Sequence, residues 1–116
     1  NCFDTVTQAH LVAKNFRLVE IHFTHKRYEV AGLPYETVSF DSTSVQFVSS
    51  DGSVITGTYF LAHGNIYFEI NPMEKGLFAI NCINDRQMSV HVYYFDNAKN
   101  KMQTAHRTFV FDVISK

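Results

Sequence analysis

The chain has 116 residues, of which 46% are hydrophobic and 18% are charged, and its net charge at pH 7 is −1 with histidine neutral. This length predicts one domain, residues 1–116, and the composition excludes an intrinsically disordered chain. The near-neutral charge provides no field that would attract nucleic acid, and no apolar run approaches the ~18 residues that span a bilayer. We therefore expect a globular protein without nucleic-acid binding or membrane insertion.

The N-terminal stretch DTVTQAHLVA is the segment that favours a helix. Asp4 is the candidate N-cap, and Val6, Ala9 and Val12 lie near helical spacing. We expect one or two helical turns here.

The rest of the chain is typical of β-strands, because short runs rich in Val, Ile, Phe, Tyr and Thr alternate with turn signals. The expected strands are 16–23, 28–31, 35–40, 45–49, 53–62, 65–70, 77–83, 88–95 and 103–114. The loops are too short for parallel crossovers, so neighbouring strands are expected to be antiparallel. The predicted fold is all-β: a meander of eight or nine strands forming a small barrel or a sandwich, with a short N-terminal helix.

The two cysteines, Cys2 and Cys82, are consistent with one disulfide between the N-terminus and a central strand. The chain starts at Asn1-Cys2 without an initiator methionine, which fits a mature secreted terminus or an artificial boundary. We expect a disulfide-bonded, secreted, extracellular protein. The alternative is two unpaired thiols in a cytosolic protein.

Two dipeptides predict tight hairpin turns, and Asp51-Gly52 is the stronger signal. A two-residue loop at this point gives Gly52 a positive φ and pairs Val48 with Ile55.

A second two-residue loop, at His63-Gly64, pairs Tyr59 with Phe68. Side chains alternate between the two faces of a strand, so these registers assign each residue to a face. One face is plainly apolar: Val48, Ile55, Tyr59, Leu61, Ile66, Phe68 and Ile70. The other is mixed: Val45, Phe47, Val54, Thr56, Thr58, Phe60, Ala62, Tyr67 and Glu69.

The mixed face needs an explanation, because a plain surface sheet would carry charges there. The strand 88–95 repeats the pattern with Tyr93 and Phe95. Three interpretations remain open. The face is buried by the helix or by another sheet, it lines an amphipathic cavity inside a barrel, or it is an exposed patch that docks a protein partner or a second copy.

A short helical turn, a long first strand and an antiparallel meander resemble the calycin group, above all the lipocalins. The segment KNFRLVEIHF, residues 14–23, sits where lipocalins carry their Gly-x-Trp strand. The late segment HRTFVF carries Arg107 near the place where lipocalins often set a basic residue against that tryptophan. Here Phe16 stands in the place of the tryptophan, and no glycine precedes it. The resemblance implies binding of a small apolar ligand.

Residues that could carry chemistry are scattered along the chain. His22 and His25 are spaced i, i+3, which places them on opposite faces of a strand and disfavours a shared metal. The carboxylates Glu20, Glu69 and Asp112 lie in apolar strands, where we expect them to face solvent or to orient a ligand. We expect no catalytic residue, no metal and no cofactor.

The predicted function is that of a secreted, non-enzymatic binding protein for a small apolar or amphipathic ligand. The alternative is a protein–protein interaction domain that uses an exposed aromatic sheet face, with a homodimer as one form. The predicted ligand-binding residues are Phe47, Phe60, Tyr67, Glu69, Tyr93 and Phe95.

Overall fold

A computed structural model of the chain describes residues 1–12, 14–23, 26–28 and 34–115. The elements are α1 (Gln8–Val12), β1 (Lys14–Phe23), β2 (Lys26–Tyr28), β3 (Thr37–Phe40), β4 (Ser44–Val48), β5 (Val54–Ala62), β6 (Asn65–Asn71), β7 (Glu74–Ile83), β8 (Gln87–Asp96) and β9 (Lys101–Ser115). Eight of the predicted strands have counterparts among them, and the predicted strand 28–31 shares only Tyr28 with β2. Of the predicted strand 28–31, residues 29–31 lie outside the described residues, as does His25.

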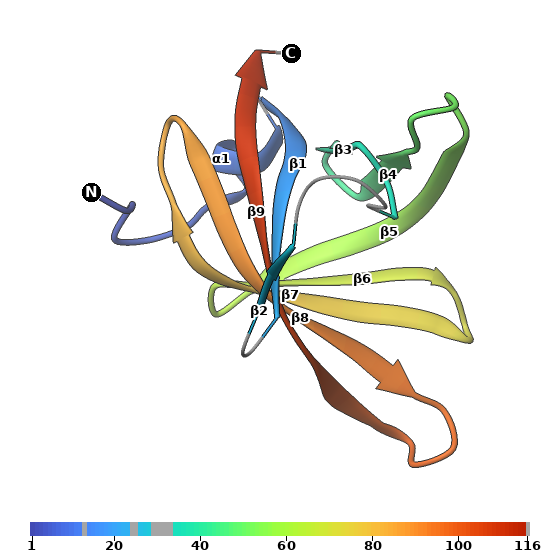
Figure 1. The fold of residues 1–116 in the computed structure, drawn as a ribbon. Helices are drawn as coiled ribbons and strands as arrows, with labels where there is room; N and C mark the ends of the chain where they lie inside the picture. The colour runs from blue at the N-terminus through green and yellow to red at the C-terminus, as the bar shows by residue number, and fades with distance from the viewer. Residues whose placement is uncertain (13, 24–25, 29–33, 116) are drawn as a thin grey trace.

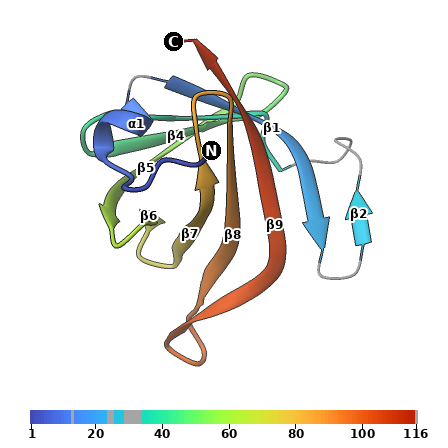
Figure 2. The same ribbon diagram turned by 90° about the vertical axis from the view of Figure 1, so that its left-hand side faces the viewer.

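Eight of the strands close into an antiparallel barrel, which confirms the all-β meander and decides for a barrel over a sandwich. The order around the barrel is β1-β3-β4-β5-β6-β7-β8-β9, and β9 pairs with β1 to complete it (Figures 1 and 2). Within the described residues, the remaining strand, β2, pairs with β1 alone, beyond the stretch of β1 that pairs with β3.

The N-terminal helix is confirmed, but it starts later than Asp4 would place it. Thr7 precedes α1, and its backbone N–H donates to Nδ1 of His10 at 3.0 Å while its carbonyl accepts from the His10 N–H. The His10 side chain thus takes the part of the Glu or Gln side chain in a capping box, whereas the His10 N–H is bound by the Thr7 carbonyl instead of its hydroxyl. Leu11 is fully buried in the core, so α1 is held by packing as well as by its cap.

One end of the barrel is tightly packed. The ring of Phe16 makes edge contacts with Phe40 and Phe111, at centroid distances of 5.9 and 6.4 Å. The fully buried side chains are Phe16, Phe40, Phe78, Phe111, Leu11, Leu18, Ile66, Ile83, Met88, Val38, Val45 and Val90. Large side chains thus fill the interior of the barrel around Phe16.

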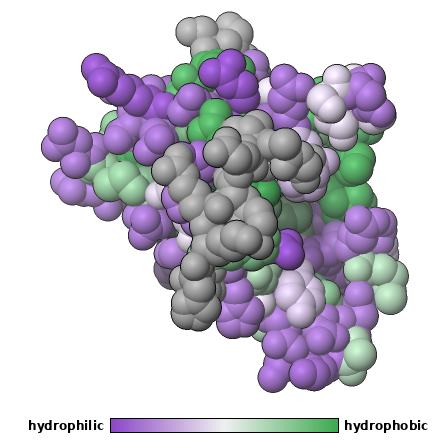
Figure 3. Space-filling model, viewed as in Figure 1, coloured by the Kyte–Doolittle hydropathy of each residue, from purple (hydrophilic) through white to green (hydrophobic). Residues whose placement is uncertain are grey.

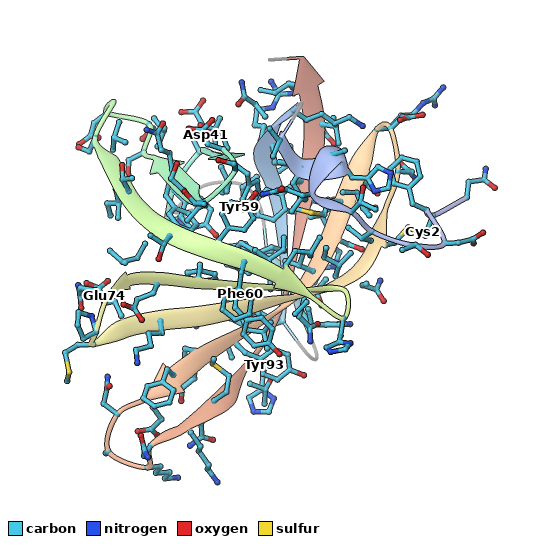
Figure 4. All side chains as sticks on the ribbon, turned by 180° about the vertical axis from the view of Figure 1, so that it is seen from behind. Cys2, Asp41, Tyr59, Phe60, Glu74 and Tyr93 are labelled. Atoms are coloured by element: carbon cyan, nitrogen blue, oxygen red, sulfur yellow. A yellow bond between two sulfur atoms is a disulfide. The ribbon has the colours of Figure 1, made fainter. Side chains whose placement is uncertain are left out.

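Hydrogen bonds tie α1 to the turn between β3 and β4 at the packed end. The Tyr59 hydroxyl donates to the Asp41 carbonyl at 2.6 Å, and the two residues lie close together in Figure 4. The side-chain amide of Gln8 donates to the Tyr59 hydroxyl at 3.2 Å and also to the carbonyl of Ser42. The helix and this turn together close one end of the barrel.

The expected disulfide is confirmed. Cys2 and Cys82 are bonded, with their Cα atoms 5.3 Å apart. Next to the bond, the Phe3 N–H donates to the Ile83 carbonyl at 2.8 Å. The N-terminal segment is therefore attached to the end of β7 by one covalent and one hydrogen bond.

The hairpin turns are where predicted, but the register of the first one is wrong by one residue. Gly52 has φ 88°, as expected. However, Val48 pairs with Val54 and Phe47 pairs with Ile55. A three-residue loop with glycine in the left-handed region replaces the two-residue loop.

The Asp51 side chain explains why the longer loop forms. Its carboxylate accepts from the Ser53 N–H at 2.9 Å, and hydrogen bonds from Ser53 hold the pKa of Asp51 below its usual range. A one-residue shift of register moves a side chain to the other face of the sheet. Phe47 and Val45 therefore belong to the inner face, and Val48 does not. The second register, with Tyr59 opposite Phe68, is confirmed.

Candidate functional site

The end of the barrel opposite α1 is open and holds a cavity of about 420 Å³. The lining residues described are Pro34, Tyr35, Phe47, Ser49, Ile55, Phe68, Ile70, Met73, Glu74, Lys75, Gly76, Phe78, Val92, Tyr93, Tyr94, Phe95 and Phe109. In Figure 3, hydrophobic side chains gather between the ends of β5 and β6 on an otherwise mainly hydrophilic face. The interior of the barrel is thus filled at one end and hollow at the other.

A continuous set of aromatic rings forms the walls of the cavity. Phe68 contacts Phe78 at a centroid distance of 5.0 Å and Phe47 at 5.6 Å. Tyr35 contacts Phe47 at 4.9 Å and Phe109 at 6.2 Å. Tilted and edge contacts of this kind are favourable and hold each ring in place. The cavity therefore presents a rigid apolar surface.

Gly76 sets the position of one wall. A Cβ atom at this residue would collide with the ring of Phe68 and would lie 3.0 Å from the Tyr93 carbonyl. Only glycine leaves space for the Phe68 ring to lie against the backbone of β7. The missing side chain thus positions a ring of the cavity wall.

The rim of the cavity is more polar than its walls. Glu74 lies at the far end of the β6–β7 hairpin (Figure 4), and its carboxylate accepts from the Asn71 side chain at 2.9 Å. The Lys75 ammonium lies 5.0 Å from the centre of the Phe95 ring and 4.0 Å from the Glu69 carboxylate. An apolar interior with a charged rim suits a ligand that has one polar end.

Tyr35 adds a polar group at the edge of the aromatic wall. Burial raises the pKa of the Tyr35 phenol above its ordinary range. The protonated hydroxyl can donate a hydrogen bond to a ligand oxygen or nitrogen.

The structure divides the six predicted ligand residues into two groups of three. Phe47, Tyr93 and Phe95 line the cavity. The other three lie on the outer face of the barrel, in a shallow groove shared with Lys75 and Met102: Phe60, Tyr67 and Glu69. The proposed mixed face is therefore not one surface, because the corrected register separates Phe47 from Phe60.

Sequence reasoning missed several lining residues. Alternation along the strands places Ile55, Phe68 and Ile70 on the plainly apolar face, and these three residues do line the cavity. Alternation identifies that face but does not show where along the barrel axis the packing stops. Tyr35 had no signal beyond its place at the start of a predicted strand, next to Pro34.

Comparison of the chain with protein-family models, curated protein sequences and solved structures gives no match. Within the described ranges, no three His, Cys, Asp or Glu side chains are grouped so that they could hold a metal ion. No helix in the described part of the chain is long and apolar enough to cross a membrane.

Proposed function

We propose that this chain is a secreted, non-enzymatic binding protein that holds a small apolar or amphipathic ligand in the open end of its barrel, in the manner of lipocalins. The observation that carries the proposal is the aromatic cavity of about 420 Å³. Its volume falls within the roughly 300–1,000 Å³ of small-molecule sites. Aromatic walls favour binding through apolar contact, and the rim hydroxyls and charges supply orientation.

The disulfide supports an extracellular location, because such bonds persist in oxidising compartments and are rare in the cytosol. It also fits a binding role. A covalent link between Cys2 and the end of β7 stabilises the frame of the barrel without occupying the cavity. This stabilisation offsets part of the free-energy cost of leaving one end of the barrel unfilled.

Two neighbouring residues offer a matched test of the cavity. Ile55 lines it, whereas Val54 faces the other side of β5, and the two are similarly exposed at 49% and 54%. A carboxylate at position 55 would have to be desolvated by an apolar ligand, so Ile55→Asp is expected to weaken binding of N-phenyl-1-naphthylamine at least about tenfold. Val54→Asp is expected to leave the dissociation constant unchanged. Fluorescence titration measures both, and equal affinities for the two variants would contradict the proposal.

A second candidate function is protein–protein interaction through the outer aromatic pair. Phe60 is 61% exposed, and its ring stacks on Tyr67 with a centroid distance of 4.9 Å. A second copy of the chain is one partner that such a pair could take.

The variant Phe60→Ser tests whether the Phe60 ring serves association or the stability of the fold. Because the ring is mostly exposed, the urea midpoint should barely change. Sedimentation velocity of the wild-type chain and the variant then tests association. Self-association that is lost in Phe60→Ser would support the interaction module, and a wild-type chain that stays monomeric at every concentration would exclude the homodimer.

A further inference from the structure

A second hollow, of about 330 Å³, lies outside the barrel where β1, β8 and β9 meet. Its lining is mainly polar and basic: His22, Phe23, His91, Tyr93, Thr104, His106, Arg107 and Thr108. Tyr93 lines this hollow and also the apolar cavity, but the two sites differ in chemistry. The lining here contains three imidazoles and a guanidinium, and none of these described lining residues is acidic.

The sheet register brings these side chains together from three strands. His22 on β1 pairs with Thr108 on β9, and Thr108 pairs with His91 on β8. Directly paired residues share a face of the sheet, so the three form one row. The Thr108 hydroxyl and Nδ1 of His91 lie 3.0 Å apart and are hydrogen-bonded. Residues far apart in sequence thus form one surface.

A bulge in β9 adds the remaining basic groups. In β9, Thr108 pairs with His91 and Thr104 pairs with Tyr93. One residue of β8 lies between these two pairs but three residues of β9 do, so β9 contains two extra residues. His106 has φ 55°, in the left-handed region, and its N–H donates to the Thr104 hydroxyl at 3.0 Å. In a regular strand, adjacent residues face opposite sides. The bulge lets His106 and Arg107 line the same hollow.

The guanidinium of Arg107 is held in place by an aromatic ring. Its central carbon lies 4.8 Å from the centre of the Phe23 ring, at the paired position on β1. A cation–π contact of this kind restricts the guanidinium and leaves its N–H groups as hydrogen-bond donors. A positive group in this position attracts anions and repels metal cations.

A carboxylate also lies beside this hollow. Glu20 on β1 is the carboxylate that binds here, to Nε2 of His22 at 2.9 Å. Among these described side chains, the Arg107 guanidinium balances the Glu20 carboxylate, and the three imidazoles and the two threonine hydroxyls supply further hydrogen-bonding groups.

We propose that this hollow binds the oxyanion of a phosphate or sulfate group, with Arg107 as the main charge partner and His22, His91 and His106 as further donors. Guanidinium and imidazole N–H groups both donate hydrogen bonds to oxyanion oxygens. The site is separate from the apolar cavity and does not depend on the function proposed for it. The oxyanion that binds here has two candidate sources: a free small anion and a sulfated polysaccharide.

Sodium sulfate is the probe for this site. NMR of the chain with labelled histidines measures its binding. At about pH 6 we expect saturable shifts of the imidazole signals of His22, His91 and His106, and none for the exposed His63 in the β5–β6 turn. Sodium chloride at equal ionic strength should not reproduce them.

Matched substitutions assign the charge. Arg107→Gln is expected to weaken sulfate binding at least about tenfold, because it removes a charge-assisted pair. Arg107→Lys should retain part of the lost affinity. The control variant Arg86→Gln, which makes the same change in the exposed β7–β8 turn, should bind sulfate with wild-type affinity. The urea midpoint of each variant verifies folding. Equal shifts at His63, shifts reproduced by chloride, or unchanged binding by folded Arg107→Gln would each overturn the proposal.

A heparin tetrasaccharide distinguishes the two sources. Binding at least about tenfold tighter than that of sulfate, and lost in Arg107→Gln, identifies a sulfated polysaccharide. Binding no tighter than sulfate identifies a free small anion. Both results support the oxyanion site, and the absence of Arg107-dependent binding for both probes rejects it.

Discussion

Replacing Phe16 with alanine is expected to lower the free energy of unfolding by about 3–5 kcal/mol. The Phe16 side chain has no exposed surface, and its ring contacts Phe40 and Phe111 at the packed end of the barrel. The substitution removes a large apolar group and leaves a void that these rigid neighbours cannot fill. Urea unfolding followed by circular dichroism measures the change.

Phe60→Ala is the matched control, because it deletes the same atoms from an exposed ring on the outer face. We expect a cost below about 1 kcal/mol for this variant. Similar losses for the two variants would show that the packed end is not where the stability of the barrel resides.

Removal of the disulfide is the second change with a large expected effect. The bond joins residues 80 positions apart, and closing such a loop in the unfolded chain stabilises the fold by up to about 4.5 kcal/mol in the chain-entropy model. The double variant Cys2→Ser, Cys82→Ser should therefore unfold at a much lower urea concentration. Thiol titration of the denatured, unreduced wild-type protein should find no free thiol.

The control for this experiment is a reducing agent. It should lower the urea midpoint of the wild-type chain toward that of the double variant and should leave the double variant unchanged. A wild-type midpoint that does not respond to reduction would contradict the assigned role of the bond.

Much of the fold could be predicted from the sequence because its signals are local. Runs of β-branched and aromatic residues mark the strands, and the short loops between them require antiparallel neighbours. The His63-Gly64 turn has φ values of 54° and 75°, which suit a two-residue hairpin, and its register followed directly. Closure of the sheet into a barrel depends on the pairing of β1 with β9, which no local signal shows.

The candidate site was harder to predict, because it depends on register and depth. At Asp51-Gly52 a glycine with positive φ fits both a two-residue and a three-residue loop, and the difference moves Phe47 from one face to the other. The sequence pattern does not predict the β-bulges either. The one at His106 changes which residues of β9 share a side, so alternation could not place His106 and Arg107 in one hollow.

The most direct test of the central claim, that the open end of the barrel is a ligand site, is methyl NMR with labelled isoleucine Cδ1 groups. Ile55 and Ile70 line the cavity, whereas Ile80 and Ile83 lie beside the disulfide. Titration with N-phenyl-1-naphthylamine is predicted to give saturable shifts of the Ile55 and Ile70 methyl signals and to leave those of Ile80 and Ile83 in place. Shifts confined to Ile80 and Ile83, or no saturable shift at Ile55 and Ile70, would contradict the account.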